Sequence, residues 1–130
     1  MLTDIKDFDE SELANFTGTE AYHKVTLGNI KATDGIAYLC QKAGCFWLMD
    51  IIASVQHLPK IQEHLSFIVW RIIKNEDNGA IVSAYWDCEE DKSYSDTKLL
   101  YRQEIKYTDF PLKEFEFYQI EDVVLLKSEY

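Results

Sequence analysis

The sequence predicts an α+β domain in which an antiparallel sheet of four to five strands, from the C-terminal half, packs on two to three helices from the N-terminal half. Apolar residues recur at helical spacing before Pro59, whereas β-branched and aromatic residues alternate with a period of two after Leu65. The 130 residues, of which 47% are hydrophobic, suffice for one ordinary core. We therefore expect one domain over residues 1–130.

The first helix signal, at residues 9–16, is weak. Asp9 or Ser11 can cap it, and Leu13 and Phe16 lie on one side. The period of residues 20–31 fits neither a helix nor a strand, so this segment receives no assignment.

The next two helices are better defined. Thr33 or Asp34 can accept the free amides of a first turn, and Gly44 is placed to end that helix. The following helix is expected from about Cys45 to His57, because a proline at position 59 stops it.

Strands are expected from residue 65 onward. The first is apolar on both faces and should be central. Asn78 and Gly79 suit the positive φ angles of a hairpin, and residues 89–96 form a polar loop. The third strand has one polar face. The predicted strands cover residues 65–73, 80–88, 99–107, 115–120 and 123–126.

The net charge and the composition limit the classes of binding partner and the cellular compartment that we expect. The net charge of −10 disfavours direct binding of nucleic acid and of anionic lipid. The acidic clusters, at residues 4–12, 89–91 and 114–129, predict a solvated surface or one that occupies a basic groove on another protein. Neither a membrane span nor a signal peptide is apparent, so we expect a cytoplasmic protein. Three cysteines, at positions 40, 45 and 88, fit reduced thiols better than a disulfide frame.

Asp50 is the first catalytic candidate, because a carboxylate within an apolar helix is either exposed or held by specific donors. Asp50, Ser54 and His57 share one helical stripe, but nothing resembles a nucleophile elbow, and the stripe also fits the polar face of an amphipathic helix. The corresponding hypothesis is a small hydrolase or acid-base enzyme that uses Asp50 with Asp34, His23 or His57.

Metal and cofactor motifs are weak. Pro59 separates His57 from His64, and the gap between Cys40 and Cys45 does not fit a zinc knuckle. The glycines are isolated, without a phosphate-binding loop. We expect neither a metal nor a cofactor.

Aromatic residues are the main binding candidates. Trp47, Trp70 and Trp86 are candidates for lining a ligand pocket, with Tyr101 supplying a hydroxyl, although core packing is the commoner role of such residues. A small-molecule ligand is therefore one expectation. Trp70 and Tyr101 also support a homodimer if a sheet face or edge is exposed.

The C-terminus is expected to be anchored, because Tyr130 follows an apolar strand almost directly. Its predicted partners are the Gly18-Thr19-Glu20 and Thr33-Asp34-Gly35 segments, which form with it a structural corner or a binding site.

Together, the motif-like segments resemble a small bacterial domain family of unknown function. They lie at residues 18–22, 33–39, 42–54, 107–112 and 124–130. The resemblance implies a stand-alone cytoplasmic domain and brings no activity or site residue with it. The leading functional hypothesis is a non-catalytic cytoplasmic binding or protein-interaction module with an acidic surface, whose partner is another protein or a second copy of the chain.

Overall fold

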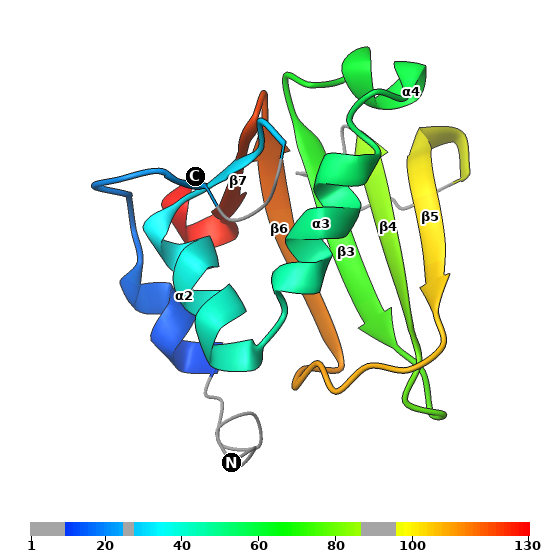
Figure 1. The fold of residues 1–130 in the computed structure, drawn as a ribbon, viewed down its shortest axis with the longest axis horizontal. Helices are drawn as coiled ribbons and strands as arrows, with labels where there is room; N and C mark the ends of the chain where they lie inside the picture. Colours follow the sequence, from blue (N-terminus) through cyan, green and yellow to red (C-terminus); the bar gives the residue numbers. More distant parts are fainter. Residues whose placement is uncertain (1–9, 25–27, 87–95) are drawn as a thin grey trace.

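The computed structural model describes residues 10–24, 28–86 and 96–130, and it confirms the α+β class (Figure 1). The elements are η1 (Glu10–Asn15), β1 (His23–Lys24), β2 (Lys31–Ala32), α2 (Asp34–Ala43), α3 (Phe46–Ser54), α4 (Pro59–Gln62), β3 (Ile68–Lys74), β4 (Ala80–Trp86), η2 (Asp96–Lys98), β5 (Leu99–Ile105), β6 (Glu114–Ile120), β7 (Val123–Leu126) and η3 (Lys127–Glu129). The predicted N-terminal cap at Asp9, the thiol of Cys88 and the acidic residues at 4–9 and 89–91 lie outside the described residues.

Over the described part of the chain, the strands form one seven-stranded sheet in the order β1-β2-β7-β6-β3-β4-β5. The prediction of four to five antiparallel strands is wrong, because β1 and β2 add strands from the unassigned segment and β2 runs parallel to β7. Strands of two residues carry no alternation that a sequence can reveal. Their backbone partners come from β7 and its turn, since Lys31 N donates to Asp122 O at 2.8 Å and Thr33 N to Val124 O at 3.1 Å.

The strands of the C-terminal half lie near their predicted positions, and β3 pairs on both sides, with β4 and β6, as predicted for a central strand. Asn78 has the positive φ angle, 66°, that its turn requires. Gly79 serves a different purpose: a Cβ atom there would lie 2.7 Å from the Ile105 carbonyl oxygen. Close approach of two backbones therefore requires this glycine.

Helix α2 has the predicted ends. The Thr33 hydroxyl accepts from Ile36 N at 3.4 Å, and Gly44 adopts the left-handed conformation with φ 64°. Helix α3 ends at Ser54, three residues before the predicted His57, and Pro59 begins the separate helix α4. Proline is favoured at a first helical position because its missing N–H would have no partner there.

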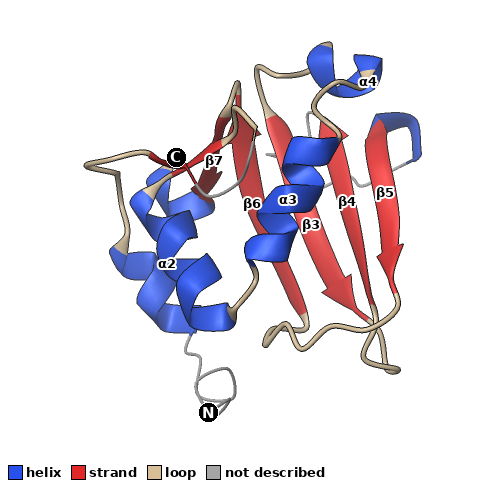
Figure 2. Ribbon diagram, viewed as in Figure 1, coloured by secondary structure: helices blue, strands red, loops and turns tan. Residues whose placement is uncertain are grey.

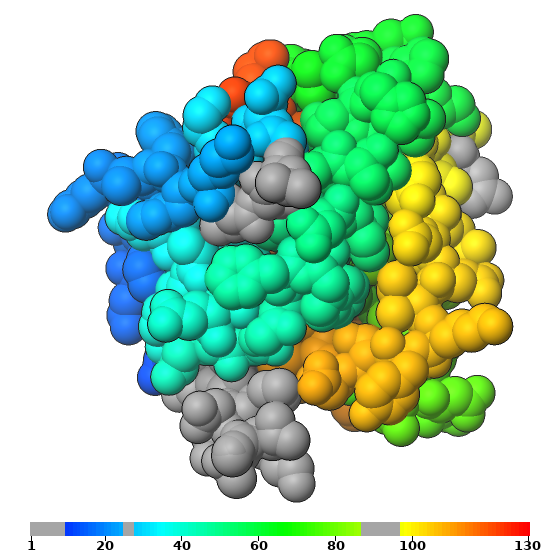
Figure 3. Space-filling view, viewed as in Figure 1, coloured from blue at the N-terminus to red at the C-terminus, as the bar shows by residue number. Residues whose placement is uncertain are grey.

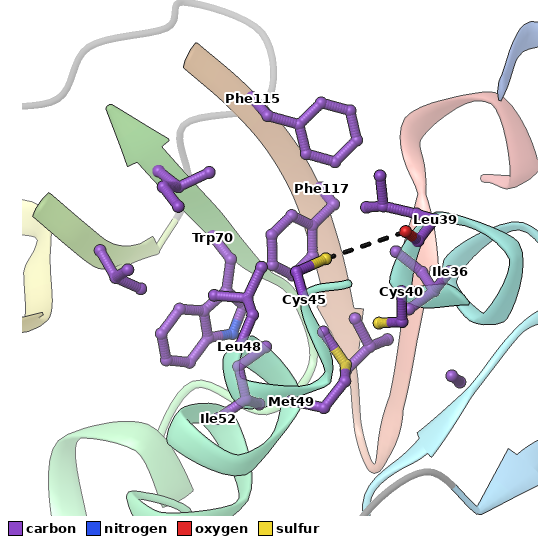
Figure 4. Packing of buried hydrophobic residues seen from close by; sticks show 14 of the residues in the cluster. Ile36, Leu39, Cys40, Cys45, Leu48, Met49, Ile52, Trp70, Phe115 and Phe117 are labelled. Atoms are coloured by element: carbon purple, nitrogen blue, oxygen red, sulfur yellow. Dashed lines mark hydrogen bonds between the residues drawn. The ribbon is translucent and has the colours of Figure 1, made fainter. Parts of the chain in front are cut away.

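The main core lies between the helices and one face of the sheet (Figure 2), as predicted. Leu48, Met49 and Ile52 of α3 pack with Trp70 and Phe117 (Figure 4). A smaller buried cluster, formed by Val69, Tyr118 and Leu125, is separate from it. Because neighbouring residues of a strand alternate between faces, this second cluster lies on the sheet face opposite α2 and α3.

A buried hydrogen-bond network joins α3 to the sheet. Gln119 is inaccessible to solvent, and its Oε1 accepts from Trp70 Nε1 at 3.0 Å. Its Nε2 donates to Gln56 Oε1 at 2.8 Å and to Glu121 O at 2.8 Å. The network satisfies polar groups whose burial would otherwise be costly.

Cys40 and Cys45 are free and buried, in agreement with the expectation of reduced thiols. The neighbouring Cys40 thiol, together with burial, raises the pKa of Cys45, so the Cys45 thiol stays neutral. Among the helices that the structure describes, none has both the length and the apolar composition of a membrane span.

Candidate functional site

The C-terminus and the two segments predicted to contact it lie together at the start of α2 (Figure 1). We call this the C-terminal corner and define it by residues 18–20, 33–35 and 128–130. The contact predicted between the C-terminus and the segment at 33–35 is confirmed.

Glu129 joins the C-terminus to α2. Its Oε1 accepts from the Thr33 hydroxyl at 2.5 Å and from Leu126 N at 2.9 Å, and its Oε2 accepts from Gly35 N at 3.0 Å. The Thr33 hydroxyl in turn caps Ile36 N. Free amides and the helix dipole both favour an anion at a helix N-terminus, so this half-buried carboxylate stabilises α2.

Gly35 makes this approach possible. A Cβ atom on residue 35 would lie 2.4 Å from Leu126 Cδ1 and 2.8 Å from Glu129 Oε1. Both distances are shorter than a nonbonded contact allows, so a larger residue would displace the side chains of Leu126 and Glu129.

Asp34 and His23 are the two catalytic candidates that the structure brings together. His23 Nε2 lies 2.7 Å from Asp34 Oδ1, and the side chains are 42% and 29% exposed. Asp34 Oδ2 also accepts from Glu20 N at 2.9 Å, while Asp34 N donates to the Thr19 hydroxyl at 2.9 Å. The bond from Glu20 N, followed by the contact with His23, holds the pKa of Asp34 below its ordinary value.

The other predicted catalytic residues lie elsewhere. Asp50 is on the exposed side of α3, and the Ser54 hydroxyl donates to Ile51 O at 2.7 Å, as in an ordinary helix terminus. His57 is exposed and lines an open groove of about 610 Å³ with Gln56 and Glu121.

The predicted aromatic binding residues divide between core and surface. Trp70 is fully buried, so it packs in the core and does not reach a surface ligand. Trp47 packs half-buried against the same core, and Trp86 stacks on His64 with 5.0 Å between ring centroids. Tyr101, on the edge strand β5, donates its hydroxyl to Gln103 Oε1 at 2.7 Å.

Tyr130 belongs to an aromatic cluster, formed by Phe67, Tyr118 and Tyr130, on the sheet face opposite the helices. Its ring centroid lies 5.4 Å from that of Phe67 and 5.4 Å from that of Tyr118. The Tyr130 residue is nevertheless 62% exposed. Ser128 fixes the same segment, since its hydroxyl donates to Phe16 O at 2.6 Å.

Sequence reasoning missed the roles of Phe67 and Tyr118 in this cluster. A signal was present, because Phe67 and Val69 share one face of a strand whose other face forms the main core. The pairing of Val69 with Tyr118 across the sheet, however, is set by the register of β3 on β6.

A further open groove of about 570 Å³ runs beside the corner, lined in part by Leu13, Phe115 and Lys127. Its size falls within the range of small-molecule sites, so such a ligand stays a prediction. Within residues 10–24, 28–86 and 96–130, no group of three or more His, Cys, Asp or Glu side chains is arranged to hold a metal ion.

Comparison with known protein families places the chain in one of them. The model of a family described as "Family of unknown function (DUF6876)" covers residues 7–130, which confirms the resemblance inferred from the motifs. No curated protein and no solved structure matches the chain.

Proposed function

This chain belongs to the DUF6876 family of unknown function, and we propose that it is a non-catalytic cytoplasmic protein-interaction module. The observation that carries the proposal is Tyr130, a residue that is 62% exposed although its ring contacts two other rings. An aromatic side chain fixed before binding loses little conformational entropy when a partner covers it.

The surroundings of Tyr130 support the same proposal. Helices α2 and α3 lie on one side of the sheet (Figure 2), and the aromatic cluster lies on the other face. Beside the cluster, Glu116 bridges Arg71 Nε at 3.2 Å and Lys127 Nζ at 2.7 Å. A central aromatic anchor with charged groups at its rim is typical of protein interfaces.

The net charge of −10 favours a basic protein as the partner. Opposite charge accelerates encounter and disfavours acidic competitors, and it makes association sensitive to salt.

Affinity capture from a lysate with wild type, Tyr130→Ala and Tyr22→Ala tests the proposal. Tyr22 is a matched control, because it is 60% exposed and lies outside the aromatic cluster. We expect a basic protein that binds wild type and Tyr22→Ala, binds Tyr130→Ala much less, and dissociates as salt rises. Capture that is equal for all three proteins, with Tyr130→Ala shown to be folded by circular dichroism, would contradict the proposal.

The second candidate function is an acid-base enzyme, and the 2.7 Å contact between His23 and Asp34 favours it. In this hypothesis Asp34 orients the imidazole, which accepts a proton from a substrate or from water. The reaction class is the one predicted from the sequence, but the carboxylate that pairs with a histidine is that of Asp34 instead of Asp50.

A panel of ester, phosphoester and amide substrates tests this second function. Activity in wild type that is lost in His23→Gln and retained in His57→Gln would support it. Activity that survives His23→Gln would exclude the His23–Asp34 pair from the reaction.

A further inference from the structure

Strand β5 is an edge of the sheet. It is the last strand in the sheet order and, among the described strands, pairs only with β4 (Figure 1). Side chains of this segment reach the surface beside α3 (Figure 3). An edge strand presents unpaired N–H and C=O groups on its outer side, which are able to pair with a further strand.

The regular part of this edge is residues 101–105. Tyr101 lies opposite Ala84 and Leu99 lies opposite Tyr85, so Leu100 is the extra residue of an irregularity just before it. Such bulges bend a strand and end its regular pairing. Any added strand therefore pairs with residues 101–105.

Two opposite charges stand on one face of this segment. The side chains of Arg102 and Glu104 are 48% and 72% exposed, and they lie 3.6 Å apart within the chain. An exposed pair at this distance contributes little to stability and leaves both groups accessible to a partner.

A second copy of β5, added antiparallel, is related to the first by a two-fold axis perpendicular to the sheet, so residues of the same face lie opposite each other. Centring the pair on Arg102 opposes two arginines, and centring it on Glu104 opposes two glutamates.

Centring the pair on Gln103 gives the complementary register. Arg102 of each copy then faces Glu104 of the other, and Tyr101 faces Ile105. Both are favourable cross-strand pairs, one ionic and one between an aromatic and a β-branched residue. In this register every residue of the regular segment, 101–105, has a partner in the same segment of the second copy.

We infer that the chain forms a homodimer by antiparallel pairing of β5 with β5 of a second copy, centred on Gln103, with reciprocal Arg102–Glu104 ion pairs. The inference uses a different surface from the proposed function and does not depend on it. Because the two-fold axis is perpendicular to the sheet, the two Tyr130 faces lie on the same side of the dimer.

Charge reversal tests the register. In Arg102→Glu, residues 102 and 104 are both glutamates, so each glutamate of one copy faces a glutamate of the other. In Glu104→Arg both residues are arginines, so each arginine of one copy faces an arginine of the other. Sedimentation velocity over a micromolar concentration series should show a dimer for wild type, with dimerisation weakened by at least about tenfold in each single variant. An equimolar mixture of the two variants should form a heterodimer, and Arg102→Glu/Glu104→Arg should dimerise as wild type does.

Two control variants test whether weaker dimerisation comes from the pairing of β5 or from the change in net charge alone. Glu10→Arg and Lys24→Glu make the same charge changes at exposed positions on η1 and on β1, the opposite edge strand of the sheet, and should dimerise as wild type does. A wild type that is monomeric throughout, single variants that dimerise normally, or a mixture of the two variants that stays monomeric would each overturn the inference. Heterodimer formation also shows that both single variants are folded.

Discussion

Glu129→Ala tests how strongly the C-terminal corner stabilises the domain. The substitution removes a carboxylate that accepts three hydrogen bonds, from Thr33, Gly35 and Leu126. It leaves the amide at the start of α2 without its anion and the Thr33 hydroxyl without its acceptor.

The magnitude follows from these contacts. A hydrogen bond to a charged group contributes about 1.5 kcal/mol or more, but water replaces part of it at a half-exposed site, and three bonds to one group are not additive. We therefore expect the free energy of unfolding to fall by roughly 2–4 kcal/mol. For a domain of this size the loss corresponds to about 10 °C in Tm.

Urea and thermal denaturation followed by circular dichroism measure this loss. Glu129→Gln should lie between wild type and Glu129→Ala, because its amide keeps one acceptor oxygen and loses the charge. Glu63→Ala is a matched control at an exposed position and should stay within about 0.5 kcal/mol of wild type. If Glu129→Ala also stays within about 0.5 kcal/mol of wild type, the carboxylate does not stabilise α2.

Four further predictions follow from single contacts. Gly35→Ala should destabilise the protein by about 1–3 kcal/mol in urea, because its Cβ would lie 2.4 Å from Leu126 Cδ1; an unchanged midpoint would show that the C-terminal turn relaxes freely. Gln119→Leu should cost about 2–4 kcal/mol by the same measurement, since it leaves the Trp70 indole N–H without its acceptor and Gln56 Oε1 without its donor; a neutral effect would mean that water enters the core. Glu121→Gly should raise the free energy of unfolding by about 0.5 kcal/mol, because Glu121 has a φ of 56° and glycine adopts that angle without strain; a loss of stability would show that the side chain outweighs the backbone. Asp34→Asn should weaken the acid dependence of stability. The pKa of Asp34 is lowered in the folded state, so its carboxylate stabilises the protein above the ordinary value of 3.8, and this contribution is lost as pH falls through the lowered pKa. The difference in unfolding free energy between wild type and Asp34→Asn should therefore shrink on acidification in urea titrations, and a constant difference would contradict the assignment.

The parts of the fold that depend on local signals could be predicted from the amino-acid sequence. Thr33 and Gly44 mark the ends of α2, and the alternation after residue 65 gives the strands from β3 to β7. The sequence also predicted an anchored C-terminus, because an aromatic residue after an apolar strand is costly to leave unpacked. The side chain that anchors the C-terminus is the carboxylate of Glu129, which lies within the motif-like segment at residues 124–130.

Which candidate residues lie close together depends on how the distant strands pair. The carboxylate that contacts His23 is that of Asp34 and not that of Asp50, because the short strands β1 and β2 place His23 at the start of α2. Trp70 turned out to be a core residue and Tyr130 an exposed one, although both are aromatic residues in or near strands. Side-chain periodicity fixes the face on which a residue lies, but the pairing of strands distant in sequence fixes which face is covered and which groups become neighbours. That pairing is a property of the assembled sheet, where β2 obtains its partner from a strand some ninety residues later, and no local pattern encodes it.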